Sequence, residues 1–143
     1  MKLIHSTCIQ MDGIGVLLRG PSGSGKSDLA LRLVMRGARL VADDYVYVGS
    51  DNGMLYATAP DEIRGKLEVR GIGILSMPHS LVCRVAAVVD LDGGDIDRLP
   101  GPAEVSLENV SLPCFRINPF EVSSGEKLLM ILRAGFKEGQ SIR

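Results

Sequence analysis

The sequence predicts a strand-rich α/β domain built around a phosphate-binding loop. Three observations lead to this fold class. Gly20-Pro21-Ser22-Gly23-Ser24-Gly25-Lys26-Ser27 fits the pattern GxxxxGK[ST] at each required position. A buried-strand pattern precedes this loop, and an amphipathic-helix pattern follows it. Elsewhere strand patterns outnumber the two clear helices, which favours a strand-rich sheet over a helix-dense, doubly wound one.

Length and composition limit the classes of protein to consider. The 143 residues are predicted to form a single domain, 1–143, with a loose tail at about 135–143. A net charge of -1 and 4% aromatic residues exclude a nucleic-acid-binding module. Neither a leader nor a membrane-spanning apolar run is recognisable. The 3 cysteines lack metal-ligand spacing, which predicts free thiols in a reducing cytoplasm.

Strand, loop and helix are expected to follow one another around the phosphate-binding loop. Residues 1–10 form a first strand, and residues 14–18 form a short buried strand that enters the loop. A helix is expected over 27–34, and Gly37 is placed to end it. The apolar residues of this helix share one face: Leu29, Ala30, Leu33 and Val34. This order is the one that a phosphate-binding loop requires.

Strand patterns dominate the rest of the chain. Residues 38–42 form a strand that ends in two acids, and a turn at 51–53 joins strands at 45–48 and 54–57. The remaining elements are expected in this order: loop or short helix over 59–65, an extended stretch over 66–75, the most apolar strand within 81–91, a turn-rich segment over 92–110, a strand over 111–117, and a helix over 127–134 after capping-box spacing at 123–126.

The phosphate-binding loop itself indicates a ligand. Its glycines let backbone N–H groups turn toward phosphate oxygens, and Lys26 supplies a positive charge for the β- and γ-phosphates. The hydroxyl of Ser27 is suited to a metal ion. The loop therefore predicts binding of a nucleoside triphosphate together with Mg²⁺.

Two acidic strand ends compete for the role of metal ligand. Asp43 and Asp44 follow an apolar strand whose carboxyl end should open onto the same crevice as the loop. One carboxylate could hold Mg²⁺, and the other could act as a general base toward an alcohol. Asp90 and Asp92 follow the most apolar strand and imitate a Walker B strand better by composition. Periodicity does not choose between them.

Two near-copies of a short motif and one histidine are further candidates. Residues 61–65 and 67–71 each pair a carboxylate with an arginine two positions later. On a strand, Glu68 and Arg70 would face the same side and could reach a metal and a phosphate. A surface ion pair explains the same spacing equally well. His5 is a lone histidine near the start of the first strand, a setting more often structural than catalytic.

Together these motifs resemble the catalytic domain of bacterial HPr kinase/phosphorylase, a strand-rich P-loop kinase domain of the HPr kinase/PEP carboxykinase-like type. That family combines an early histidine, a loop ending GKS, a helix ending RG, a strand ending ADD and the signature LEIRGLGI. The matching residues cover roughly 1–117 and are His5, Gly20 to Ser27, Arg36-Gly37, Val41-Ala42-Asp43-Asp44 and Leu67-Glu68-Val69-Arg70-Gly71-Ile72-Gly73-Ile74. The signature also selects the second near-copy, because Gly71-Ile72-Gly73-Ile74 follows that one alone.

The resemblance implies a role for each matching residue. Lys26 and the loop residues Gly20, Pro21, Ser22, Gly23, Ser24, Gly25 and Ser27 would hold ATP. Ser27 and Glu68 would bind Mg²⁺, and Asp44 would be the base for phosphorylation and the acid for dephosphorylation. His5 and Arg70 would belong to the active site, and Arg98 resembles a later active-site arginine. Asp90 then becomes a strand-end residue.

The acceptor implied by the resemblance is a serine of the small phosphocarrier protein HPr. The chain looks like the short form of some proteobacteria, without the additional N-terminal domain and with a short C-terminus. The family's dephosphorylation loop reads PVRPGRN, and in residues 114–120 only Arg116 matches it, so kinase activity is a firmer implication than phosphorylase activity. A cytoplasmic location is implied, and hexamers are typical of the family.

Two other functions compete with this interpretation. A small-molecule kinase would also carry a phosphate-binding loop, but it leaves the signature unexplained and would need a lid of clustered arginines. A nucleotide-binding sensor without catalysis would need neither His5 nor Asp44. Labelled ATP, offered with and without HPr, separates the three.

Overall fold

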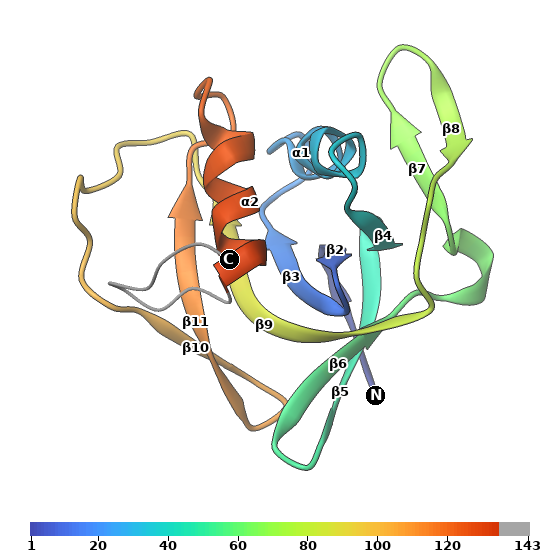
Figure 1. Ribbon diagram of the computed structural model, residues 1–143, viewed down its shortest axis with the longest axis horizontal. Helices are drawn as coiled ribbons and strands as arrows, with labels where there is room; N and C mark the ends of the chain where they lie inside the picture. The colour runs from blue at the N-terminus through green and yellow to red at the C-terminus, as the bar shows by residue number, and fades with distance from the viewer. Residues whose placement is uncertain (135–143) are drawn as a thin grey trace.

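Two helices cover one face of a curled sheet in the computed structural model, which describes residues 1–134 (Figure 1). The predicted loose tail at about 135–143 lies outside the described residues. The elements are β1 Lys2–His5, β2 Thr7–Met11, β3 Ile14–Arg19, α1 Lys26–Val34, β4 Arg39–Ala42, β5 Tyr45–Asp51, β6 Met54–Thr58, the 3₁₀ helix Asp61–Ile63, β7 Lys66–Val69, β8 Gly73–Ser76, β9 Val82–Leu91, β10 Glu104–Leu107, β11 Val110–Ile117 and α2 Ser124–Ala134. The prediction of a strand-rich α/β fold is confirmed.

The long strand β9 organises the main sheet. This sheet has nine strands, in the order β1-β5-β6-β9-β3-β2-β4, with β11 beside β9 and β10 beside β11. One side of β9 pairs in parallel with β3. Its other side pairs first with β6, antiparallel, and then with β11, parallel. The sheet therefore divides along β9, and its two arms curl apart below the helices in Figure 1.

The loop and the first acidic strand end meet at one edge of this sheet. Strand β2 runs antiparallel to both β3 and β4. Strands β3 and β4 consequently run in the same direction, although they are not neighbours. The phosphate-binding loop leaves the carboxyl end of β3, and Asp43 and Asp44 leave the carboxyl end of β4. Both segments are thus brought to the same edge, as the pattern predicts.

Apolar residues pack on both faces of the sheet. On the helix side, Leu18 of β3 packs with Leu29 and Leu33 of α1 and with Leu128 of α2, all at most 1% exposed. On the other side, Leu17 packs in a second cluster that includes β5, β6, β9 and β11. Burying each such leucine contributes about 1.5–3 kcal/mol. This packing fixes α1, and with it the loop, against the sheet.

Residues 1–10 form two strands where the sequence pattern predicts one. Strand β1 pairs with β5, whereas β2 pairs with β3 and β4, so the two strands occupy separate positions in the strand order although one residue joins them. The chain changes course at Ser6, which is fully buried. Its N–H donates to the carbonyl of Asp44 at 3.0 Å, and its Oγ donates to the carbonyl of Leu18 at 2.8 Å. A buried polar residue needs such partners, and they redirect the chain here.

The structure adds detail to three other predictions of local structure. The extended stretch 66–75 is a hairpin of β7 and β8, with a turn in which Gly71 has φ 83°. Strand β10 lies inside the turn-rich segment 92–110, and α2 starts at Ser124 rather than at 127. The hairpin forms a separate two-stranded sheet that projects beside α1 in Figure 1.

The cysteines are free thiols, as predicted. Cys8 and Cys83 are buried, and Cys114 is half-buried. The Sγ atoms of Cys8 and Cys83 lie 3.6 Å apart. This hydrogen bond, together with burial, raises the pKa of Cys8 well above its ordinary value, which keeps the thiol protonated and unreactive.

Candidate active site

The phosphate-binding loop turns tightly between β3 and α1. Gly25 caps α1 with φ 98°, a left-handed conformation that favours glycine. A Cβ at this position would lie 3.2 Å from Cβ of Pro119, so the residue is constrained by space as well. The turn leaves the first N–H groups of α1 directed at the loop, where the helix dipole favours an anion.

Lys26 is held inside the loop. Its side chain is buried, with 6% of the residue exposed. Nζ donates to the carbonyls of Gly20 at 2.6 Å and Pro21 at 3.1 Å. These bonds compensate the buried ammonium and keep its positive charge within the curve of the loop. The loop thus offers both amides and a charge to a phosphate group.

Asp43 joins the loop to β2 and to the β7–β8 hairpin. Its Oδ1 accepts hydrogen bonds from Ser27 Oγ at 2.7 Å and from Thr7 Oγ1 at 3.0 Å. Its Oδ2 accepts a longer bond, 3.4 Å, from the backbone N–H of Glu68. The residue is buried, and no arginine or lysine pairs with it in the described part of the chain. In the described residues its two oxygens therefore meet hydroxyl and backbone N–H donors rather than a cation.

Asp44 faces a different partner from its neighbour. His5 Nε2 donates to Asp44 Oδ1 at 2.8 Å, with 39% of the histidine side chain and 57% of the aspartate side chain exposed. Asp44 has φ 70°, which is strained for a non-glycine residue. With this backbone conformation, the two adjacent carboxylates contact different partners, Ser27 at Asp43 and His5 at Asp44. Its N–H donates to Thr7 Oγ1 at 3.2 Å, which helps to hold this conformation. The ring of Tyr45 lies 5.5 Å from that of His5.

A cavity of about 870 Å³ connects these groups. Phosphate-loop residues form one wall, the acidic strand end another, and the β7–β8 hairpin a third. Its lining includes Lys26, Ser27, Asp43, Asp44, Glu68 and Arg70. Five of these six are predicted site residues, and the predicted loop residues Ser22, Gly23 and Gly25 line the same cavity. His5 reaches the cavity through its bond to Asp44. Arg70 does so from the hairpin turn, not from the extended strand on which its pairing with Glu68 was expected.

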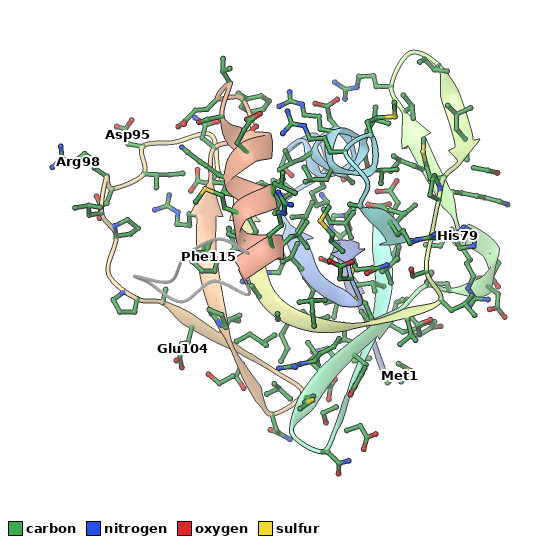
Figure 2. The ribbon with its side chains drawn as sticks, in the orientation of Figure 1. Met1, His79, Asp95, Arg98, Glu104 and Phe115 are labelled. Carbon is green, nitrogen blue, oxygen red and sulfur yellow. The ribbon has the colours of Figure 1, made fainter. Side chains whose placement is uncertain are left out.

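The structure does not bring Arg98 to this cavity. Arg98 is exposed on the loop between β9 and β10. Figure 2 shows it near Asp95 at the outer edge of the view, on the other side of α2 from α1 and the hairpin. Its match to an active-site arginine rests on a short motif in a segment without regular secondary structure.

The acids at the end of β9, Asp90 and Asp92, form ion pairs with arginines. Asp90 accepts two hydrogen bonds from Arg19, at 2.8 and 3.0 Å, and a third from the Cys114 thiol. Asp92 pairs with Arg116 and accepts a bond from the N–H of Gly94. The carboxylate beside it raises the pKa of Arg19, and burial raises that of Cys114. Both acids are already neutralised.

The near-copies of the short motif also separate. Arg64 pairs with Asp61 at 2.9 Å and donates to the carbonyl of Ala59 at 3.3 Å. That first copy forms a 3₁₀ helix and lies outside the cavity lining. The second copy supplies Glu68 and Arg70 to the cavity. The first is a surface ion pair, and the second lines the candidate site.

The oxygen donors near Ser27 fit Mg²⁺. A hydroxyl and the carboxylates of Asp43 and Glu68 line the same cavity, and hard cations prefer such ligands. Among residues 1–134, no three His, Cys, Asp or Glu residues gather to form a metal cage. Mg²⁺ in phosphoryl-transfer sites takes one or two carboxylates and completes its shell with phosphates and water. Sequence reasoning named Ser27 and Glu68 for the metal and left Asp43 unassigned within the acidic pair.

No helix in the described residues is long and apolar enough to span a membrane.

Comparisons with known proteins identify relatives of this chain by sequence. The family model for the HPr Serine kinase C-terminal domain matches residues 1–84. HPr kinase/phosphorylase of Clostridium tetani is 33% identical over 142 residues, covering 92% of this chain and 46% of that protein. The Peptoclostridium acidaminophilum enzyme is 37% identical over 148 residues, covering 95% and 47%. The chain thus spans about half the length of these curated relatives.

A solved structure supports the fold independently. The Hpr(Ser) kinase/phosphatase from Coxiella burnetii superposes with a TM-score of 0.77 at 23% identity, covering 90% of this chain and 96% of that chain. A likeness at this identity establishes a shared fold.

Proposed function

Since the chain belongs to the HPr serine kinase C-terminal domain family, we propose that it transfers the γ-phosphoryl group of ATP to a serine of an HPr-like phosphocarrier protein. The observation that carries this proposal is the joint lining of one cavity by Lys26 and Asp44, with His5 bonded to Asp44 at 2.8 Å. A phosphate-binding cation and an exposed carboxylate are what transfer to an alcohol needs.

In the proposed reaction, the serine oxygen of the acceptor attacks the γ-phosphorus. Asp44 takes the hydroxyl proton as the new oxygen–phosphorus bond forms. The bond from the γ-phosphorus to the β,γ-bridging oxygen breaks, and ADP leaves with that electron pair. His5 orients the carboxylate through its hydrogen bond. Lys26 and Arg70 stabilise the negative charge that develops on the transferred group.

Ser27, Asp43 and Glu68 would hold Mg²⁺ in this proposal. The ion would neutralise charge on the phosphate oxygens of the bound nucleotide. Asp43 is added to the predicted pair because its carboxylate contacts the Ser27 hydroxyl at 2.7 Å. The buried backbone of β4 and the Thr7 hydroxyl keep that carboxylate in place before any ligand arrives.

Phosphorylation of the acceptor is better supported than its reversal. Dephosphorylation would use Asp44 as the acid that returns a proton to the serine. The one residue that matches the family's dephosphorylation loop, Arg116, is bonded to Asp92 and lies outside the cavity lining. We therefore assign transfer to the carrier as the principal activity. The proposal places the chain in the cytoplasm, where ATP and phosphocarriers occur.

A transfer assay tests the proposal. The protein is incubated with Mg²⁺ and ATP labelled in the γ-phosphate in three parallel reactions. One contains HPr, one contains HPr whose acceptor serine is replaced by alanine, and one contains buffer in place of HPr. Label on the unaltered HPr and on no other component supports the proposal, and Lys26→Ala should abolish this labelling. Transfer to a small molecule instead, or ATP binding without transfer to any acceptor, would replace it with one of the two competing functions.

A further inference from the structure

A second cavity, of about 430 Å³, adjoins the first along the phosphate-binding loop. Ser22, Gly23 and Phe120 line both cavities. The remaining lining of the second comes from the start of the loop and the end of β9: Pro21, Ser24, Leu91, Asp92 and Gly93. A ligand that follows the loop can therefore extend from one cavity into the other.

The two linings differ in charge. The first cavity has Lys26 and Arg70 together with four carboxylates. The second has one carboxylate, Asp92, and no lysine or arginine in its lining among the described residues. A phosphate chain finds its cations in the first cavity. The second suits an uncharged, flat group with hydrogen-bond donors at its edge.

Phe120 is the group that such a ligand would meet. It is 73% exposed, although a phenyl ring gains most from burial. The N–H of Phe120 donates to the side chain of Asn118 at 3.0 Å, which fixes the turn that carries the ring. A Cβ on Gly93 would lie 3.4 Å from the ring carbon Cε2, so one edge of the ring lies against backbone. The ring is positioned, and much of it is uncovered.

The carboxylate of Asp92 is likewise fixed in position and can accept further hydrogen bonds. Arg116 and the N–H of Gly94 each bond one of its oxygens. Together they lower the pKa of Asp92, so the carboxylate stays an acceptor. Each oxygen retains a lone pair for another donor. An exocyclic amino group of a purine is such a donor.

We propose that the second cavity binds the base of the nucleotide, with the base stacked on Phe120 and its amino edge toward Asp92. The proposal rests on the proposed function only in that the ligand is a nucleoside triphosphate. In this proposal the loop before α2 takes part in nucleotide binding through Phe120. The phosphates lie with Lys26 in the first cavity, and the base lies beside Phe120 in the second.

Calorimetric titration with two ligands tests this subsite. ATP and inorganic tripolyphosphate, each with Mg²⁺, are titrated into the wild type and into Phe120→Ala. Stacking on an aromatic ring is worth about 1–3 kcal/mol per base, so the variant should bind ATP about tenfold more weakly. Tripolyphosphate has no base, and its affinity should be unchanged. No acceptor protein is present, so the outcome is independent of whether serine is phosphorylated.

Two further variants control for the loop. Val122→Ala removes a side chain that is 98% exposed in the same loop and lines neither cavity, so it should change neither affinity. Phe120→Tyr keeps the ring and should bind ATP within about twofold of the wild type. The proposal is overturned if Phe120→Ala leaves ATP affinity intact, or if it weakens both ligands equally.

Discussion

The acidic ends of β4 and β9 differ in their partners far more than in their sequence. Each has two carboxylates at the end of an apolar strand, and each strand ends beside the phosphate-binding loop. At β4, hydroxyls and a histidine contact the acids: Ser27 and Thr7 at Asp43, and His5 at Asp44. At β9, arginines contact them. A carboxylate that is already neutralised by a guanidinium has little capacity for a metal or a proton, so chemistry belongs at β4.

The register of the sheet explains why arginines of β3 and β11 contact the acids at the end of β9. Arg19 lies directly opposite Asp90 in the parallel pairing of β3 with β9. Arg116 lies opposite Asp90 in the pairing of β11 with β9 and bonds Asp92, two positions further along. Cross-strand neighbours of opposite charge stabilise a sheet. The same composition therefore serves structure at one strand end and is free for function at the other.

Asp44→Asn should give the largest effect, because it removes the proposed base from the β4 end. We expect kcat for transfer to the carrier to fall by about 10²–10⁴-fold, the range typical of a general base. ATP affinity should stay close to that of the wild type, since the loop amides and Lys26, rather than Asp44, are proposed to hold the phosphates. Steady-state transfer kinetics and nucleotide titration measure the two quantities. A variant with full transfer activity would remove Asp44 from the mechanism.

Asp43→Ala should affect both activity and stability. The hydroxyls of Thr7 and Ser27 would lose a buried, charged acceptor, which costs about 1–3 kcal/mol in the free energy of unfolding. The Mg²⁺ concentration needed for half-maximal transfer should rise as well. Urea unfolding and a Mg²⁺ titration test these outcomes, with Asp51→Ala, an exposed acid at the end of β5 that lines neither cavity, as the control. Unchanged Mg²⁺ dependence would contradict the assignment of Asp43 to the metal.

Asp90→Asn tests the β9 end and should leave transfer unchanged. Its pair with Arg19 has two good hydrogen bonds, but about a third of each side chain is exposed and solvent weakens the attraction. We expect the free energy of unfolding to fall by about 0.5–1 kcal/mol. A loss of activity comparable to that of Asp44→Asn would reverse the comparison between the two strand ends.

Acid pH should reveal the smallest effect, at Asp92. The N–H of Gly94 and then Arg116 hold the pKa of Asp92 below its ordinary value of 3.8. A carboxyl with a lowered pKa in the folded state stabilises the fold above its unfolded pKa, and this contribution is lost as pH falls through the folded value. Arg116→Ala should therefore be slightly less stable than the wild type at pH 7. At pH 2.5 the difference in urea midpoint should shrink, and a constant difference would argue against this ion pair.

Local patterns were sufficient to predict the loop, helix α1, the β5–β6 hairpin and strand β9, because each depends on spacing along a short segment. Local patterns could not predict which residues on different strands contact one another. The contact of His5 with Asp44 joins residues 39 positions apart, and the roles of these two residues came from resemblance rather than from periodicity. Composition favoured Asp90 over Asp43, since it contains no information about which side chain lies on the next strand. The bend at Ser6 was missed because its buried partners belong to distant segments.

The bend at Ser6 also makes formation of the site depend on contacts between distant parts of the chain. The β2–β3 hairpin is local and can form from one short segment. The bond between His5 and Asp44 joins residues 39 positions apart and accompanies the pairing of β1 with β5. Contacts of such long sequence separation form slowly, so the hairpin can fold before His5 and Asp44 meet.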